Sequence, residues 1–140
     1  MPTKAKGQRG SADRLFSALV RSHGKCQAIG QDWHPRCAGR LECSHLISRK
    51  YSWTRTEEQN ALCLCSSAHR YVGADPGAHF YLGSEIFGLG HWLALRKQAD
   101  NRDKFDWSTE IERLKARGRT PPHGSPNRVK RQSGKPPASR

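Results

Sequence analysis

The sequence predicts a small α+β domain with a zinc-binding loop, flanking helices and disordered basic tails. Two short apolar runs, residues 41–47 and 61–65, have the length and composition of strands. Stretches with apolar residues at helical spacing lie before and after them. Only 34% of the 140 residues are hydrophobic, and five of the residues are cysteines. A domain with so small a core usually requires an additional cross-link, such as a metal ion or disulfides, to be stable.

A helix is expected from Ser11, a good N-cap residue, to about Ser22. Leu15 and Leu19 form its apolar stripe, and Gly24 would end it in a left-handed conformation. The loop that follows is rich in Gly, Pro and Cys and leads to the first strand.

Residues 48–59 between the two strands are polar and predict a long functional loop. A helix is expected directly after the second strand, from Ser66 or Ser67, so the centre of the chain is strand, loop, strand, helix. Glycines interrupt the apolar residues that follow Pro76, which favours two short helices over one long helix. A last helix is predicted over about 107–116.

The basic charge lies mostly at the two ends of the chain. The formal net charge is +13, yet residues 11–112 hold 13 basic and 12 acidic residues. We therefore expect a disordered basic arm over 1–10, a folded domain over 11–116 and a disordered basic tail over 117–140. Arms of this kind bind phosphate backbones without sequence selectivity, which indicates a nucleic-acid partner. The alternative is a pair of solubilising ends.

The cysteines predict a structural zinc site. Cys26 and Cys37 lie on the loop before the first strand, and Cys63 and Cys65 lie where the second strand meets its helix. Four thiolates would complete a closed tetrahedral site. Cys43 remains an alternative to Cys63, and a set of buried free thiols is the alternative to zinc. The odd cysteine count, with no apolar leader or membrane-spanning run, favours a reducing cytoplasmic location without membrane contact.

Three residues inside this cysteine frame could carry hydrolytic chemistry. His45 is followed by Leu-Ile-Ser-Arg, Asn60 lies nine residues before His69, and Cys65 lies four residues before His69. Histidine can accept a proton near neutral pH or bind a divalent metal. With this spacing, the chain resembles the HNH endonucleases, in particular the small HNH proteins of bacteriophages and prophages, over about residues 13–116.

The resemblance implies a ββα-metal fold and a role for each residue. His45 would be the general base that activates water, and Asn60 would hold the loop between the strands and orient that base. His69 would bind a divalent cation, Mg²⁺, Mn²⁺ or Ni²⁺, beside the scissile phosphate. Many family members carry an acidic metal ligand where this chain has Ser44, so the second metal ligand is left open among His79, Asp75, Glu42 and water.

The expected function is that of a phage-type HNH endonuclease that hydrolyses DNA in the interior of the host cell. Partners from phage packaging, such as a terminase, or from recombination are compatible with the resemblance. Four basic residues flank the motif and are candidate DNA contacts: Arg49, Lys50, Arg55 and Arg70. The main alternative is a zinc-stabilised DNA-binding protein with the same fold and no catalysis. A colicin-type toxin is less favoured because no translocation domain is recognisable.

Overall fold

The computed structural model describes residues 4–119 and consists of six helices, a short 3₁₀ turn and one antiparallel hairpin within that range. The elements follow one another in this order: α1 (Lys4–Arg21), β1 (Leu41–His45), α2 (Ser52–Arg55), η1 (Glu58–Asn60), β2 (Ala61–Cys65), α3 (Ser66–Ala74), α4 (Pro76–Phe87), α5 (Gly90–Ala99) and α6 (Trp107–Gly118). The predicted α+β class is confirmed. The predicted tail falls mainly on residues 120–140, which lie outside the described residues.

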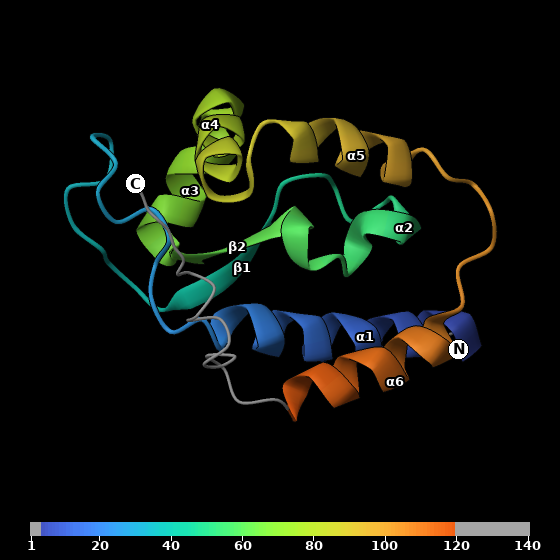
Figure 1. Cartoon of the computed structure of the whole chain (residues 1–140). Coiled ribbons are helices and arrows are strands. Elements are labelled where there is room, and N and C mark those ends of the chain that lie inside the picture. The colour runs from blue at the N-terminus through green and yellow to red at the C-terminus, as the bar shows by residue number, and fades with distance from the viewer. Residues whose placement is uncertain (1–3, 120–140) are drawn as a thin grey trace, which may run out of the picture.

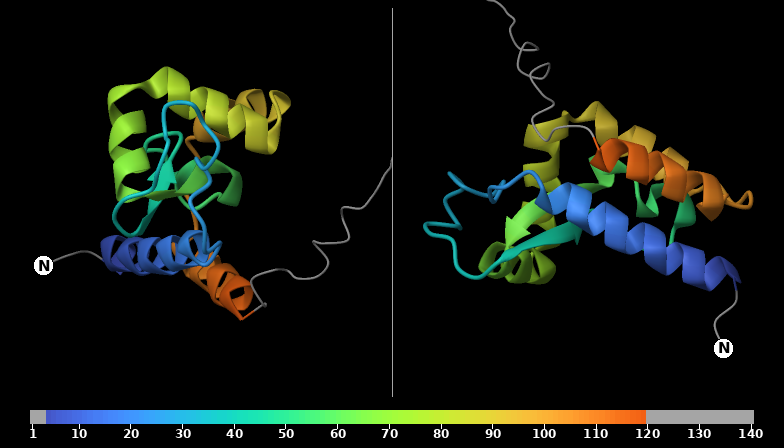
Figure 2. Two further views of the ribbon diagram at one scale, coloured as in Figure 1. Left: turned by 90° about the vertical axis from the view of Figure 1, so that its left-hand side faces the viewer. Right: turned by 90° about the horizontal axis from the view of Figure 1, so that it is seen from below.

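The hairpin lies between a lower layer formed by α1 and α6 and an upper group formed by α3, α4 and α5 (Figure 1). Strand residues alternate between its two faces. Leu62 and Leu64 belong to a core that includes Val72 and Leu82 from the upper helices. The other face contributes Ala61 to the core between α1 and α6 (Figure 2). Each face of this two-stranded sheet is therefore covered by helices.

Helix α1 begins at Lys4, seven residues earlier than expected, so residues 4–10 are helical and the prediction of a disordered arm is wrong for them. Ser11 does not cap the helix, because it lies within α1; its hydroxyl accepts a hydrogen bond from Arg14 one turn later. Ala12 and Phe16 of α1 pack with Trp107 and other residues of α6, and this contact stabilises the helix beyond its intrinsic propensity.

The other predicted elements agree with the structure apart from their ends. Gly24 has a φ of +84°, as expected for the end of a helix. Gly88, with a φ of +92°, separates α4 from α5 as two helices. The carboxylate of Asp106 caps α6 by accepting from the Thr109 amide. No helix in the described range is both long and apolar enough to cross a membrane.

Strand β1 ends at His45, two residues before its predicted end, and the loop that follows contains α2 and η1. The Leu46 amide still donates to the Asn60 carbonyl, at 2.8 Å. Beyond this point the Asn60 side chain replaces the strand partner of Ile47, accepting from its amide at 2.7 Å and donating to its carbonyl at 3.0 Å. The loop therefore departs from the sheet without leaving Ile47 unpaired.

Candidate functional site

Four side chains converge at one end of the hairpin into a group that could hold a metal ion. Their ligand atoms all lie within 4.8 Å of one another, and the residues are Cys26, His34, Cys37 and Cys65. His34 Nε2 lies 3.2 Å from Cys37 Sγ, 3.4 Å from Cys65 Sγ and 3.8 Å from Cys26 Sγ. A tetrahedral zinc ion with ordinary bond lengths separates a nitrogen and a sulfur ligand by about 3.5 Å. The group therefore has the size and the donor set of a structural zinc site.

The fourth member of this group corrects the sequence prediction, since His34 takes the place expected for Cys63 or its alternative, Cys43. The side chains of Cys63 and Cys65 do point to the same side of the strand, but residues two apart on a strand are about 6.7 Å apart. Two thiolates on one zinc are only about 3.8 Å apart. Cys63 instead lies opposite Cys43 in the sheet register and receives a hydrogen bond from the Gly24 backbone.

The spacing between His34 and Cys37 could have revealed the missing ligand. Two residues lie between the two positions, an interval at which paired zinc ligands commonly occur. A pair with this spacing is easily overlooked when only cysteines are considered as ligands. The His34 side chain is 6% exposed, which is unusual for a histidine without a partner.

Local contacts prepare Cys65 to act as a thiolate. Burial raises its pKa, but hydrogen bonds from the Ser67 hydroxyl and from the backbone of Ala68 and Ala38 outweigh burial and lower the pKa to about 6. Cys65 precedes α3, so the amides of the first helical turn supply part of this effect. Burial and the neighbouring Cys65 and Cys26 raise the pKa of Cys37 to about 11. A divalent cation is what would allow all the thiols of the group to ionise together.

The loop that carries three of these ligands is fastened to the hairpin and to α3. The Gln27 amide donates to the Cys63 carbonyl at 2.8 Å, and the Gln27 side chain accepts from the Cys63 amide at 2.8 Å. Trp33 stacks on Tyr71 of α3 with ring centroids 4.4 Å apart. The loop has no helix or strand of its own within residues 25–40, so these contacts and the metal group determine its path.

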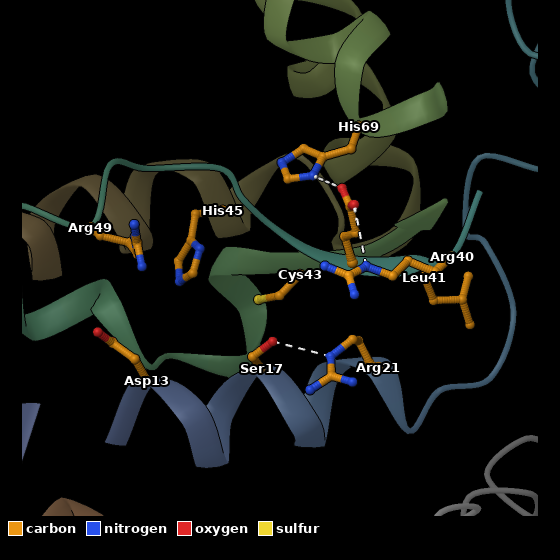
Figure 3. Close-up of a pocket in the computed structure, with 10 residues that line it drawn as sticks. Asp13, Ser17, Arg21, Arg40, Leu41, Cys43, His45, Arg49 and His69 are labelled. Carbon is orange, nitrogen blue, oxygen red and sulfur yellow. Dashed lines mark hydrogen bonds and ion pairs between the residues drawn. The ribbon is translucent and has the colours of Figure 1, made fainter. Parts of the chain in front are cut away.

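A separate pocket of about 640 Å³ lies between α1, β1 and α3 and contains two of the three motif residues, His45 and His69 (Figure 3). The other lining residues come from α1, from β1 and from the adjoining loops, and most of them are charged or polar: Asp13, Ser17, Arg21, Arg40, Leu41, Glu42, Cys43 and Arg49. The third motif residue, Asn60, is fully buried and does not line the pocket.

The tautomer of His45 follows from one hydrogen bond. Its Nε2 lies 2.9 Å from the carbonyl oxygen of Arg55, which can only accept, so Nε2 carries the proton. The Nδ1 atom of the neutral ring is then left as a proton acceptor. Burial lowers the pKa of His45 below 6.5, although the bond to Arg55 partly opposes this shift. His45 is therefore a neutral base at pH 7.

The side chain of Arg55 is committed to the fold, so its interpretation as a DNA contact has no support here. Its guanidinium makes two hydrogen bonds to the carboxylate of Asp13 on α1, at 2.8 and 2.7 Å, and a third to the Arg49 carbonyl. Both members of this pair are largely buried, at 18% and 22% side-chain exposure. This fork holds α2 against α1 and thereby positions the carbonyl that orients His45.

His69 has the hydrogen-bond arrangement typical of a metal-binding histidine. Its Nδ1 lies 2.8 Å from a carboxylate oxygen of Glu42, and the Ser66 hydroxyl donates to the other oxygen at 2.9 Å. A carboxylate on one ring nitrogen is the usual support for a histidine that binds metal through the other, and here that other atom is Nε2. The bond to His69 and the bond from Ser66 lower the pKa of Glu42.

The described residues do not form a complete metal site around His69. His69 is not a member of any described group of three or more potential ligand atoms. Ser44 is 1% exposed, and its hydroxyl lies 3.0 Å from His79 Nε2. Burial, followed by the nearby His69 and His45, lowers the pKa of His79 to about 4. Any cation at His69 would therefore complete its coordination with water or phosphate oxygens.

The Asn60 side chain bonds to two points of the loop between the strands. Besides its two bonds to Ile47, its amide nitrogen donates to the Thr54 carbonyl at 2.9 Å. Thr54 directly precedes Arg55, whose carbonyl lies 2.9 Å from His45. Asn60 is therefore connected to His45 through the loop backbone, and no hydrogen bond joins the two side chains in the described residues.

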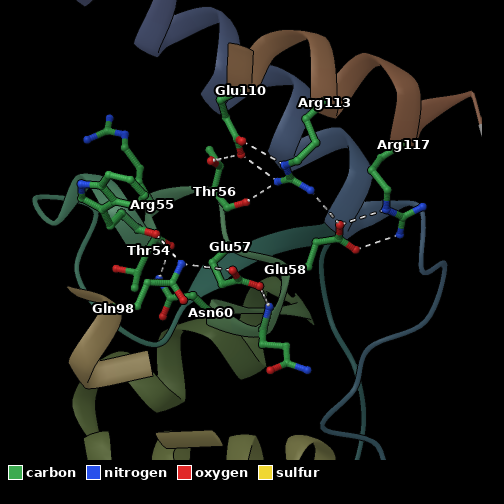
Figure 4. A network of polar contacts seen from close by, with 12 residues as sticks. Thr54, Arg55, Thr56, Glu57, Glu58, Asn60, Gln98, Glu110, Arg113 and Arg117 are labelled. Carbon is green, nitrogen blue, oxygen red and sulfur yellow. Dashed lines mark hydrogen bonds and ion pairs between the residues drawn. The ribbon is translucent and has the colours of Figure 1, made fainter. Parts of the chain in front are cut away.

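The loop is also anchored from the side of α6 (Figure 4). Glu58 receives two hydrogen bonds from Arg117, at 2.9 and 2.8 Å, and the bonds from Arg117 lower the pKa of Glu58. Arg113 donates to the Thr56 carbonyl and pairs with Glu110. Helix α6 therefore supports the loop between the strands from one side while Asp13 on α1 holds it from another.

Replacing Asn60 with alanine should lower the free energy of unfolding by about 2–4 kcal/mol, because three buried backbone groups would lose their partner. Urea unfolding followed by circular dichroism measures this difference. Gln59→Ala is the matched control, since Gln59 is exposed beside it, and should change stability by less than about 0.5 kcal/mol. Equal effects of the two changes would contradict the structural role of Asn60.

The remaining predicted DNA contacts differ in position. Arg49 lines the pocket, whereas Lys50 and Arg70 are exposed and outside its lining. Arg21 and Arg40, which were not predicted as DNA contacts, also line it. Arg40 directly precedes β1 and could have been found from the sequence, whereas only the packing of α1 beneath β1 brings Arg21 to the site.

The fold and the metal group define a small α+β protein whose Cys₃His cluster could bind a structural zinc ion. Comparison with protein-family models, with curated proteins and with solved structures found no match to this chain. The assignment of function therefore depends on the chemistry of the pocket.

Proposed function

We propose that this chain is a metal-dependent endonuclease of the HNH type, which hydrolyses DNA phosphodiester bonds in the pocket between α1, β1 and α3. The observation that carries the proposal is the pairing of a neutral, oriented His45 with a carboxylate-supported His69 on the wall of one pocket. The order β1, β2, α3, with the loop pinned by Asn60, is the arrangement that the resemblance to HNH proteins implies.

In this mechanism each residue has a separate task. His45 Nδ1 accepts a proton from the attacking water, while the Arg55 carbonyl keeps the ring in place through Nε2. His69 Nε2 would hold a divalent cation, and Glu42 fixes the orientation of the ring. The cation, when bound, supplies positive charge for the phosphate and for the leaving 3′ oxygen. Arg49 adds a further positive charge at the pocket wall.

The Cys₃His group, which is separate from the pocket, also supports this proposal. Cys65 is directly followed by α3, the helix that carries His69, and Cys37 lies in the loop that leads into β1. A zinc ion bound there would join these segments and so define the spacing between Glu42 and His69. We assign this zinc a structural task and not a catalytic one, because all four positions would be filled by protein ligands.

The test is nicking of supercoiled plasmid by the full chain after removal of loosely bound metal. Mg²⁺, Mn²⁺ or Ni²⁺ should each be compared with a metal-free sample, and conversion to open circles should require one of them. The zinc content is measured in parallel, so that loss of the structural ion is not mistaken for loss of the catalytic one. DNA binding with no metal-dependent nicking would contradict the proposal.

One observation favours the alternative, a zinc-stabilised DNA-binding protein without catalysis. His69 belongs to no group of three or more potential ligands in the described residues, and the buried Ser44 lies where many HNH proteins carry an acidic ligand. Binding alone in the plasmid assay is the result that this alternative expects.

A further inference from the structure

The pocket holds more positive charge than its own carboxylates balance. The two carboxylates in its lining are already engaged, Asp13 with Arg55 and Glu42 with His69. Among the described residues, no ion pair shorter than 4.0 Å joins Arg21 or Arg49 to a carboxylate. Within the described part of the chain, the side-chain hydrogen bond of Arg21 goes to the neutral Ser17 hydroxyl, at 3.2 Å. Guanidinium groups left in this way on the wall of a pocket are suited to bind an anion.

These charges lie at the two ends of the pocket (Figure 3). Arg49 lies beyond His45, whereas Arg21 and Arg40 lie at the opposite end, with Cys43 between. Arg40 is 88% exposed, and its contact with Glu42 is long, at 3.9 Å. The backbone from Arg40 to His45 extends roughly 16 Å, while successive phosphates of one DNA strand rise about 3.4 Å each along the helix axis. The pocket is therefore long enough to contact several phosphates.

A second group of cations continues from the Arg49 end. Lys50, Arg96 and Arg102 all lie against the ring of Tyr51, at 5.1, 5.6 and 5.5 Å from its centroid. Of these three, only Arg96 is paired with a carboxylate of the described residues, that of Asp100. Three like charges around one ring repel one another, and binding of a polyanion would relieve this repulsion.

We propose that Arg21 and Arg40 bind phosphates on one side of the bond to be cut and that Arg49 and Lys50 bind phosphates on the other side. The site is then built for internal bonds of a nucleic-acid strand, with charge on both sides of the scissile phosphate. This inference rests on the proposed endonuclease function for the position of the cut, but its binding test does not depend on cleavage.

The binding test uses a fluorescent DNA duplex in EDTA, titrated with the full chain at several salt concentrations. Arg21→Gln combined with Arg40→Gln should weaken binding on the order of tenfold at 0.1 M salt and lower the salt slope by about 0.9 for each contact removed. Lys97→Gln is the control, since Lys97 is exposed on α5 outside the pocket lining. It should change the salt slope by no more than about 0.9, the value for a single contact. Arg21→Lys with Arg40→Lys should restore most of the slope.

Cleavage kinetics separate this inference from the proposed function. The kcat/KM of the double Gln variant is measured on DNA and on bis(p-nitrophenyl) phosphate, which has a single phosphate. Relative to wild type, kcat/KM should fall at least tenfold more on DNA than on the small substrate. Failure of the wild type to hydrolyse either substrate would refute the proposed function, and the salt slope would still decide the inference. An unchanged slope in a folded double Gln variant would overturn it.

Discussion

Replacement of His45 by alanine should reduce metal-dependent DNA nicking by about 10²–10⁴-fold, the usual contribution of a general base. The reason is that His45 Nδ1 is the proton acceptor left over once Nε2 is held by the Arg55 carbonyl. His45→Gln preserves most of the side-chain volume and should lose activity to a similar degree. Initial rates of plasmid nicking at saturating metal measure both variants, and circular dichroism checks that they are folded.

His91→Ala is a suitable control, because His91 lies on α5 outside the pocket, where its ring contacts Phe87 and lies within hydrogen-bond distance of the Gly88 and Gln59 carbonyls. It should nick DNA at the wild-type rate. Undiminished cutting by a purified, folded His45→Ala protein would refute the proposed mechanism.

The pH profile of the wild type provides a second measure of His45. Burial holds its pKa below 6.5, so the neutral base is fully present at pH 7.5. The rate should stay level between pH 7 and 8 and decrease about tenfold per unit once the pH falls below that pKa. A rate that keeps rising above pH 7.5 would indicate a different base.

Loss of a zinc ligand should have the largest effect on stability. Cys65→Ser or His34→Ala should lower the bound zinc from about one ion per chain to a small fraction of that and abolish cooperative unfolding or cost several kcal/mol. The stabilisation that structural zinc supplies to small domains is comparable with the whole stability of such a domain. Metal analysis of the purified protein and thermal unfolding with and without a chelator provide the measurements.

Cys63→Ala distinguishes the two possible ligand sets. Cys63 lies outside the metal group but is fully buried, so the variant should keep its zinc and lose only about 1 kcal/mol from the small cavity. Cys43→Ala should also retain zinc, since Cys43 lies outside the metal group and lines the separate pocket. Loss of zinc in Cys63→Ala with retention in His34→Ala would reverse the assignment.

Much of the secondary structure could be predicted because its determinants are local. Strand β2, the start of α3 and the Asp106 cap of α6 follow from short stretches of sequence and match the structure. The start of α1 could not be predicted in the same way. Some of residues 4–10 have a low helix propensity. The segment is helical as the first part of α1, a helix that is stabilised by packing along α6.

The sequence by itself determined the chemical types present: a frame of cysteines, two histidines and an asparagine at intervals that a hairpin and a helix bring near one another. Tertiary structure alone decided which of them meet. It placed His34 among the thiols, directed Arg55 to Asp13 and brought Arg21 into the pocket. The physical reason is that spacing along a strand or helix sets contacts only between near neighbours, whereas these partners belong to segments that meet through packing around the hairpin.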